Sequence, residues 1–235
     1  MDHAIFPAAV DLALAEHPQW QPDAADRYCG RCGGTLGPFE GKPLGCSQCA
    51  MNRLPWGRLV RLGAYQSPLS DWIVSMKFAG TWSWASWMGR RLAEQVRLGE
   101  TPNRVAICPV PMAWSRRVRR GYNQAALIGE AMAAACGWPL APVLRRRRTP
   151  PQTTVPRSRR ADNVRRAFAA RSVDLTGWTI WLVDDVRTTG ATLHACALRL
   201  RAAGALRVCV AVAAVADCPD YARRYVAAVQ AGPGT

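Results

Sequence analysis

The sequence predicts an α/β fold, with a parallel β-sheet flanked by helices and a small four-cysteine module on its N-terminal side. Short apolar runs at residues 59–65, 104–110, 180–183 and 207–215 have the composition of strands, and stretches with helical apolar spacing separate them. Two Cys-X-X-Cys pairs precede the first run, and an acidic, threonine-rich turn follows the third. Strands that alternate with helices are typical of a doubly wound parallel sheet.

Four units are expected along the 235 residues. Residues 1–27 hold a helix that ends near Pro18 and then a connector, and residues 28–56 hold the cysteine module. Residues 57–218 form the α/β domain, and residues 219–235 form a C-terminal tail. A chain of this length can bury one good core and carry a small appended module.

The charge balance is strongly basic, with 31 Lys and Arg against 16 Asp and Glu, a net charge of +15. Such a chain attracts polyanionic ligands or nucleic acid, although a solvated basic surface accounts for part of the excess. The N-terminal stretch does not resemble a signal peptide, and no run approaches 18 apolar residues, so we expect no membrane span and a cytoplasmic location. In that compartment the nine cysteines favour metal ligands and free thiols over disulfides.

The two Cys-X-X-Cys pairs predict a zinc ribbon. Cys29 and Cys32 form the first pair, and Cys46 and Cys49 form the second after thirteen intervening residues. Four protein thiolates leave no open coordination position, so the zinc would be structural. A redox pair would require a βαβ context that is absent here, and an iron site is the other alternative.

Helices are expected between the strands. Ser67-Pro68 opens one that runs to Lys77-Phe78, and the apolar spacing within residues 82–98 predicts a second. A third runs from Asn123-Gln124 to about Cys136, and Asn123 and Gln124 could cap that helix or contact a substrate. The tryptophans of the second helix favour a core role over stacking on bases, because they recur at helical spacing.

Basic residues follow the strand at 104–110, where open α/β sheets bind ligands. Arg116, Arg117 and Arg120 have the fork geometry that matches phosphate oxygens, so they predict a pyrophosphate contact, with a solvated basic loop as the alternative. Lys77, at a helix end, is either an anion contact or a partner of the helix dipole.

Residues 145–168 are too polar for a core and too rich in proline for one helix. They predict a mobile basic flap that contains Gln152 and Arg160. Such a flap could close over a phosphorylated substrate and exclude water from the reacting carbon, or it could bind a nucleic-acid backbone.

The turn after the strand at 180–183 joins two carboxylates to a small-residue loop and a helix start: Asp184, Asp185, Thr188, Thr189, Gly190, Ala191 and Thr192. Backbone N–H groups, threonine hydroxyls and the helix dipole can hold a phosphate monoester there. The two carboxylates can accept from ribose hydroxyls or bind hydrated Mg²⁺. An ordinary βα turn with solvated acids is the simpler alternative.

This stretch resembles the 5-phosphoribosyl-1-pyrophosphate (PRPP) signature of type I phosphoribosyltransferases, in which an apolar run precedes two acids and a Thr-Thr-Gly-X-Thr loop. The resemblance implies that residues 188–192 bind the 5′-phosphate of PRPP and that a magnesium ion accompanies the substrate.

Several motifs, and their order along the chain, are similar to those of the ComF/GntX-like family of that superfamily over about residues 28–216. They are the four cysteines, Tyr65 with Lys77-Phe78-Ala79-Gly80, Cys108-Pro-Val-Pro111 with Arg120-Gly-Tyr-Asn-Gln124, Thr149-Pro-Pro-Gln152 with Arg160, Asn163 and Ala167-Phe168, and Val183 to Thr192. The resemblance implies a type I phosphoribosyltransferase fold with a zinc-binding extension, and links to natural competence, incoming single-stranded DNA or DNA damage responses. It does not imply an acceptor. Residues 1–28 lack the further cysteine pair of many members, and Arg187 replaces a more usual apolar residue.

Three functions follow as hypotheses. The first is a Mg²⁺-dependent phosphoribosyltransferase that displaces pyrophosphate from PRPP, with Asp184 and Asp185 on ribose or magnesium. The second is a competence protein that binds single-stranded DNA without turnover. The third is a regulator that binds PRPP as a signal. Competence proteins are expected partners, and the sequence does not indicate an oligomeric state.

Overall fold

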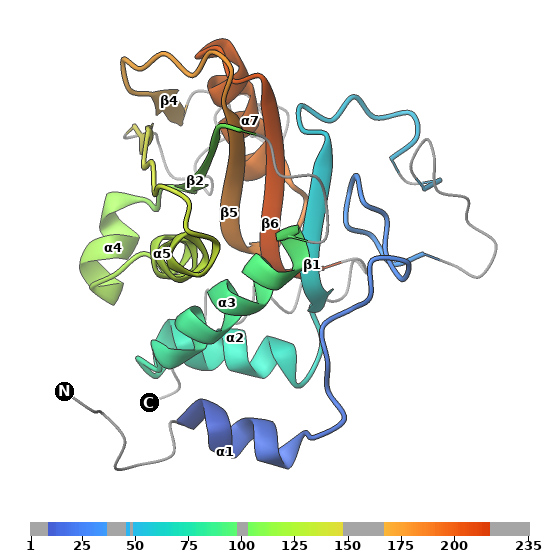
Figure 1. The fold of residues 1–235 in the computed structure, drawn as a ribbon. Coiled ribbons are helices and arrows are strands. Elements are labelled where there is room, and N and C mark those ends of the chain that lie inside the picture. Colours follow the sequence, from blue (N-terminus) through green and yellow to red (C-terminus); the bar gives the residue numbers. More distant parts are fainter. Residues whose placement is uncertain (1–8, 37–45, 48, 98–102, 148–166, 217–235) are drawn as a thin grey trace, which may run out of the picture.

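The computed structural model describes residues 9–36, 46–47, 49–97, 103–147 and 167–216. Its centre is a four-stranded sheet in the order β1-β6-β5-β2. These strands are β1 (Arg58–Ala64), β2 (Val105–Pro109), β5 (Thr179–Arg187) and β6 (Arg207–Val215), and every pair is parallel. Helices lie on both faces (Figure 1). The predicted parallel α/β sheet is confirmed.

All four strands end at the same edge of the sheet because all four are parallel. The two central strands are almost entirely buried, and Leu182 of β5 lies in register with Val210 of β6 and Cys108 of β2. Strand β5 is longer than the predicted run at 180–183. It pairs with β6 as far as Arg187, so both aspartates belong to the strand itself.

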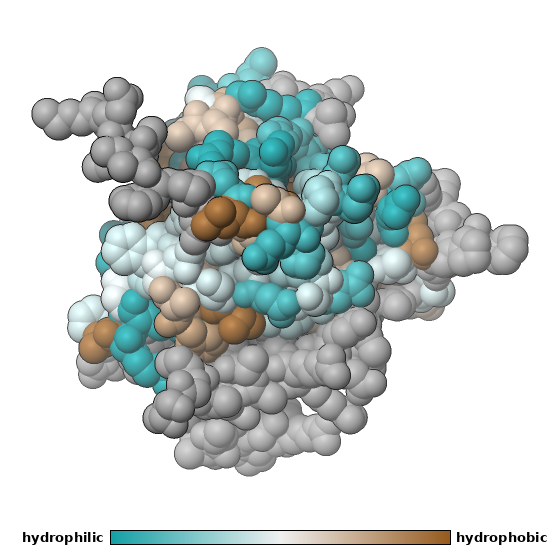
Figure 2. All heavy atoms as spheres, turned by 90° about the horizontal axis from the view of Figure 1, so that it is seen from below, coloured by the Kyte–Doolittle hydropathy of each residue, from teal (hydrophilic) through white to brown (hydrophobic). Residues whose placement is uncertain are grey.

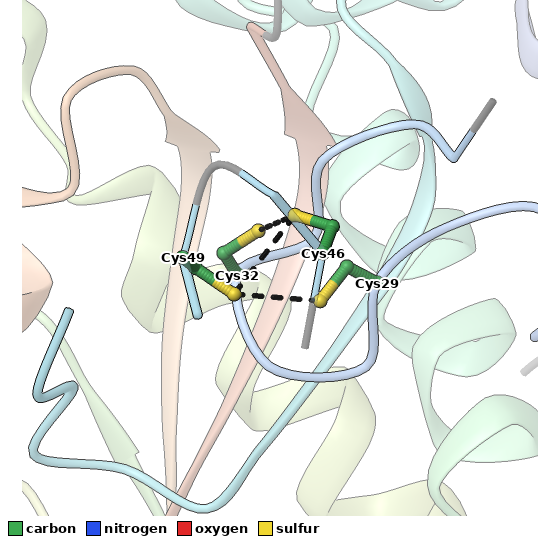
Figure 3. A group of neighbouring side chains, drawn as sticks. All are labelled: Cys29, Cys32, Cys46 and Cys49. Atoms are coloured by element: carbon green, nitrogen blue, oxygen red, sulfur yellow. Dashed lines mark hydrogen bonds between the residues drawn. The ribbon is translucent and has the colours of Figure 1, made fainter. Parts of the chain in front are cut away.

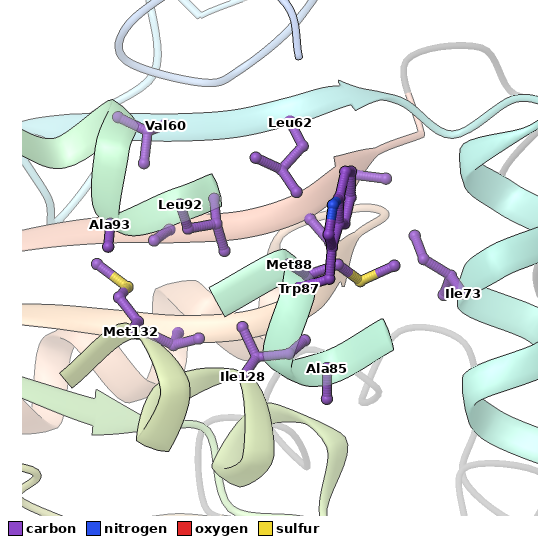
Figure 4. Close-up of a cluster of buried hydrophobic side chains, with 14 of the residues drawn as sticks. Val60, Leu62, Ile73, Ala85, Trp87, Met88, Leu92, Ala93, Ile128 and Met132 are labelled. Atoms are coloured by element: carbon purple, nitrogen blue, oxygen red, sulfur yellow. The ribbon is translucent and has the colours of Figure 1, made fainter. Parts of the chain in front are cut away.

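One face of the sheet is covered by α2 (Leu69–Phe78), α3 (Ser83–Arg97) and α5 (Gln124–Cys136), with α1 (Ala9–Glu16) packed outside them. Figure 4 shows side chains of β1, α2, α3 and α5 meeting in this core. Trp84 and Trp87 are buried within it, which confirms that they belong to the core. The predicted bounds of these helices agree with the observed ones to within one or two residues.

Helices α3 and α5 approach each other closely at Gly89. A Cβ atom at this position would lie 2.5 Å from the carbonyl oxygen of Ile128 and 2.6 Å from Cβ of Ala131. Only a glycine leaves room for that backbone. The contact fixes α5, and therefore the start of α5, relative to the carboxyl edge of β2.

The opposite face is covered by α7 (Ala191–Ala202) and by a two-stranded antiparallel sheet of β3 (Leu144–Arg146) and β4 (Phe168–Ala170). Leu193, Ala197 and Leu200 of α7 are buried, as their spacing predicts. Leu198, which belongs to the same apolar pattern, is exposed because its position in the turn points away from the row of buried residues.

The basic stretch after β2 is a short helix, α4 (Trp114–Arg120), and not the loop given as an alternative. Gly121 ends it in the left-handed conformation, with φ of 80°. The expected flap begins and ends in the β3–β4 pair. Gln152 and Arg160, like the C-terminal tail, lie outside the described residues. No helix in the described part of the chain is long and apolar enough to cross a membrane.

Candidate functional site

The four cysteines predicted to bind metal come together. Their sulfur atoms all lie within 4.8 Å of one another, and all four side chains are buried. In Figure 3 Cys29 and Cys32 extend from one loop and Cys46 and Cys49 from another, and the four thiols point toward a common centre.

The sulfur separations suit a single tetrahedral ion. Three of them are 3.5 Å (Cys32 to Cys46), 3.6 Å (Cys29 to Cys49) and 3.9 Å (Cys46 to Cys49). Four thiolates about 2.3 Å from a zinc ion would lie roughly 3.8 Å apart. The cysteines therefore fit a structural metal such as zinc, and their chemistry leaves that ion no open position.

Backbone amides favour a thiolate at the first cysteine. Burial alone would raise the pKa of Cys29, but N–H groups of Cys32, Arg31 and Cys46 outweigh it and lower the pKa to about 7. A thiol that ionises near neutral pH is a ready metal ligand. By contrast, burial raises the pKa of Cys108 to about 12, and this cysteine is a small residue of the core.

A buried arginine fastens the cysteine module to the sheet. Arg61 in the middle of β1 is 1% exposed, and its guanidinium donates to the carbonyl of Gly33 at 2.6 Å and to the hydroxyl of Thr35 at 2.9 Å. It also pairs with Asp23 at 2.8 Å. Sequence reasoning missed this residue, although a charge in the middle of an apolar strand was a signal for it.

The two aspartates of the predicted ligand site lie on β5 at the carboxyl edge of the sheet. Because successive strand residues point to opposite faces, the two side chains are directed differently. Asp185 faces the layer that contains α2, and its Oδ2 atom pairs with Nζ of Lys77 at 2.8 Å. The two groups form a buried ion pair, so Lys77 has a charged partner within the protein.

The environments of the two carboxyls differ in consequence. Burial would raise the pKa of Asp185, but the Lys77 ammonium outweighs it and holds the pKa below the usual value. Asp184 is half-buried, and its Oδ1 accepts from the Asp185 amide at 2.9 Å. Burial and then the negative charge of Asp185 raise its pKa well above the ordinary range. One carboxyl is thus held ionised and the other holds a proton more readily.

A second cation lies close to Asp185. The guanidinium of Arg120 stands over the ring of Phe78 at 5.1 Å, beside Lys77 at the end of α2, and its charge also lowers the pKa of Asp185. The Tyr122 hydroxyl donates to the carbonyl of Met76, which holds the turn between α4 and α5 against α2. Lys77 and Arg120 therefore converge on one carboxylate.

The described part of the structure gives no contact with the Asp185 cluster for two further arginines of α4. Arg117 is exposed. Arg116 belongs to α4, but its side chain lies outside the described part of the molecule. Neither is brought into the cluster around Asp185 by a described contact.

The first residues of α5 contribute a buried amide. Asn123 does not cap the helix through its side chain, which instead donates to the carbonyl of Val110 at 3.0 Å. Gln124 is 1% exposed, and its Nε2 has no hydrogen-bond partner in the described part of the chain. A buried, unpaired donor is costly and is characteristic of sites that complete their hydrogen bonds with a ligand.

The threonine-rich loop connects β5 to α7. Gly190 is buried with φ of 76°, its carbonyl accepts from the His194 amide at 2.8 Å, and α7 begins at Ala191. The Ala191 amide contacts the Thr189 hydroxyl at 3.3 Å. Since Gly190 supplies no capping side chain, the first turn of α7 retains N–H groups that an anion can bind.

Two larger side chains pack at Gly190. A Cβ atom there would lie 3.3 Å from Nε of Arg187 and 3.9 Å from Cη2 of Trp56. Nε of Arg187 is buried and has no hydrogen-bond partner among the described residues. The loop is thus bordered by a cation and by an indole from the segment after the second cysteine pair.

The fold and the site define a class: an α/β protein whose parallel sheet has an acidic pair and a Thr/Gly loop at its carboxyl edge and a four-cysteine module at its side. No family model matches the chain. Curated proteins do. DNA utilization protein YhgH of Salmonella typhimurium is 32% identical over 189 residues, 77% of this chain and 80% of that protein. Competence protein F of Haemophilus influenzae is 32% identical over 194 residues, 75% and 80% of the two chains. The chain belongs to the competence protein F/YhgH family.

Solved structures also resemble it. Glutamine PRPP amidotransferase from B. subtilis, complexed with ADP and GMP, matches 56% of this chain and 26% of its own, with 21% identity and a TM-score of 0.39. TT1426 from Thermus thermophilus matches 61% and 78% of the two chains, with 21% identity and a TM-score of 0.36.

Proposed function

We propose that the protein binds PRPP with Mg²⁺ and transfers its phosphoribosyl group to an acceptor with release of pyrophosphate, in a role linked to competence and DNA utilization. One observation carries the proposal: two adjacent carboxyls, one of them paired with Lys77, stand at the carboxyl end of β5, directly before a Thr/Gly loop that opens a helix. The names of the curated relatives support the link to DNA.

In this proposal the 5′-phosphate binds residues 188–192 through amides and threonine hydroxyls. Asp184, which forms no ion pair among the described residues, accepts from a ribose hydroxyl or binds the magnesium ion. Asp185 acts through its pair with Lys77. Carboxylate oxygens are the ligands that Mg²⁺ prefers, so the donor set fits that ion.

The transfer breaks the bond between C1 of the ribose and the pyrophosphate oxygen, and it forms a bond between C1 and the acceptor. The electron pair of the broken bond leaves with pyrophosphate, and the acceptor proton passes to solvent or to the released pyrophosphate. Lys77 and Arg120 stabilise the charge that develops on the leaving group. Arg116, Arg117, Gln152 and Arg160 are the further candidates for that contact.

The test is pyrophosphate release from PRPP and Mg²⁺, with nucleobases, related heterocycles and single-stranded DNA offered in turn. The variant Asp184→Asn/Asp185→Asn is compared with Asp26→Asn, a matched change at an exposed aspartate of the connector. Release that requires one acceptor, survives in Asp26→Asn and disappears in the double variant supports the transferase. Tight PRPP binding without release from any acceptor instead indicates a PRPP-sensing regulator.

Helix α4 favours a second candidate function, the binding of single-stranded DNA without turnover. Trp114 is 66% exposed and Val118 64% exposed, one turn apart, and Arg117 and Arg119 beside them are exposed too. Exposed indoles interspersed with arginines are suited to stacking bases and neutralising phosphates. A steep loss of DNA affinity with rising salt, shared by Asp184→Asn/Asp185→Asn, together with an affinity that is lower at every salt concentration in Trp114→Ala, supports this function. Binding that is weak and indifferent to salt contradicts it.

A further inference from the structure

Trp56 lies between the four-cysteine module, to which it is hydrogen-bonded, and the Thr/Gly loop, beside which its ring is packed. Its indole Nε1 donates to the carbonyl of Arg31 at 2.7 Å, and Arg31 sits between the two cysteines of the first pair. The indole is 5% exposed and belongs to the core on the α7 side of the sheet. Its Cη2 atom borders Gly190, 3.9 Å from where a Cβ would stand. A single side chain thus spans from the metal site to the loop.

The module end of this connection is held firmly by the sheet. The Leu59 amide donates to the carbonyl of Gly30 at 2.6 Å, and Arg61 binds the carbonyl of Gly33. A Cβ at Gly33 would lie 2.5 Å from Cδ2 of Leu59, so the first cysteine pair packs directly on β1. Three parts of that turn therefore have fixed partners, and Trp56 is one of those partners.

The loop end has few bonds of its own: the Gly190 carbonyl accepts from the His194 amide at 2.8 Å, and the Ala191 amide donates to the Thr189 hydroxyl at 3.3 Å. Gly190 lacks a side chain and adopts a left-handed conformation, so the position of the turn depends on what packs against it. The atoms nearest to the place where a Cβ of Gly190 would stand belong to Arg187 and Trp56. A change of the indole would move the amides of the first turn of α7 relative to one another, and an anion site depends on that alignment.

We infer that Trp56 is a positioning residue that couples metal occupancy of the four-cysteine site to the conformation of residues 188–192, and through it to the affinity for a phosphate-bearing ligand. The part that concerns affinity rests on the proposed function. The metal would restrain Cys29 and Cys32 on either side of Arg31, in addition to the bonds that the sheet makes, and the indole would carry that restraint to the Gly190 turn. By linkage, the phosphate ligand tightens metal binding by the same factor.

The experiment compares zinc-loaded wild type with Trp56→Phe, which keeps a ring but loses the donor, and Trp56→Leu, which loses the ring. Trp84→Phe is the matched control, because Trp84 is equally buried but belongs to the core on the other face. Hydrogen exchange of the amides at 188–192, zinc content and PRPP affinity by calorimetry are measured. We expect full zinc content, faster exchange confined to the loop, and an affinity for PRPP lowered roughly three- to tenfold in Trp56→Phe, with a larger loss in Trp56→Leu. The control should change neither loop exchange nor affinity.

A second experiment, with a chelator, tests the coupling between metal occupancy and the loop. Removal of zinc should speed exchange at 188–192 in wild type and add little in Trp56→Leu, where the connection is already lost. If both variants keep zinc and match wild type in loop exchange and in affinity, the inference is wrong. If Trp56→Leu fails to fold, Trp56→Phe against Trp84→Phe decides alone. Loop exchange that responds to zinc and to Trp56, in a protein that binds no PRPP, supports the coupling while it overturns the proposed function.

Discussion

At the scale of single residues, the two aspartates of β5 show how strand geometry separates chemically identical groups. Asp185 points to the face where α2 ends and meets Lys77, so its charge is compensated inside the protein. Asp184 points to the other face, where its carboxyl accepts from the amide of its neighbour and stays under the influence of the Asp185 charge. A half-buried carboxyl beside a second one costs stability, and such a cost is commonly tolerated where a ligand later supplies a partner.

Substitution of the two aspartates should therefore have opposite effects on stability. Asp185→Asn leaves the Lys77 ammonium buried without a countercharge, so the free energy of unfolding should fall by about 3–5 kcal/mol. Asp184→Asn removes a carboxylate that burial and Asp185 disfavour, so stability at neutral pH should rise. Urea denaturation at pH 7 measures both, with Asp26→Asn as the control. Equal losses in the two variants would contradict the assignment of charges.

The same pKa shifts predict a pH dependence. Because the pKa of Asp184 is raised in the folded protein, the unfolded chain releases this proton first as the pH rises above about 4. The stability of wild type relative to Asp184→Asn should consequently decrease as the pH rises toward the folded pKa. Asp185 has a lowered pKa, so its stabilisation is complete above the ordinary aspartate range and is lost only at more acidic pH. Urea curves from about pH 4 to about pH 8 separate the two, and a pH-independent difference would count against this account.

Sequence reasoning located the acid pair and the cysteines because each forms a local pattern. It could not locate the partner of Lys77, which joins the end of α2 to β5 across more than a hundred residues of chain. It also missed Arg61, Trp56 and the exposure of Leu198, since each depends on which elements pack together. These features could be recognised only once the packing of the elements around the sheet was known.

At the scale of elements, the pattern of strands and helices was predictable. The periodicity of the apolar residues and the positions of the glycines indicated the same elements along most of the chain. The exceptions lie at the carboxyl edge. Strand β5 continues four residues beyond its apolar run because β6 offers a ladder as far as Val215. The arginine-rich stretch forms α4 although its two apolar side chains, Trp114 and Val118, stay exposed. Tertiary pairing and a glycine C-cap decided both cases.

The contact of α3 with α5 gives a prediction at this scale. Gly89→Ala improves helix propensity, but the added methyl would clash with the Ile128 carbonyl and with Ala131. We expect the overpacking to dominate and the free energy of unfolding to fall by about 1–3 kcal/mol. Ser86→Ala, at an exposed position of the same helix, is the control and should be nearly neutral. Thermal denaturation compares the two, and a stabilised Gly89→Ala would show that the helices can separate at no cost.

At the scale of the whole molecule, the two candidate sites share one framework. The cysteine module lies beside β1 at one edge of the sheet (Figure 1), and the acid pair lies at the end of β5. Seen from below, the described residues show hydrophilic and intermediate areas with small separate apolar patches between them (Figure 2). Together with the net charge of +15, such a surface suits polyanionic partners.

Metal removal should therefore act beyond the module. We expect a chelator to lower the melting temperature of the entire protein, because β1 loses neighbours that it contacts through Arg61 and Leu59. Differential scanning calorimetry with and without chelator, followed by return of zinc, measures the effect. Arg61→Met should reproduce part of the loss with zinc still bound. An unchanged transition after complete zinc removal would show that the module and the sheet are independent.

The N-terminal region also covers the outer edge of β1. The carbonyl of Gly30 accepts from Leu59, and the amide of Asp23 donates to Leu62, so backbone groups that β6 does not reach are already bonded. An uncovered edge of a parallel sheet is a template for strands of other molecules. The four cysteines thus bear on solubility as well as on folding: we expect a chain that has lost its metal to expose this strand edge and to self-associate.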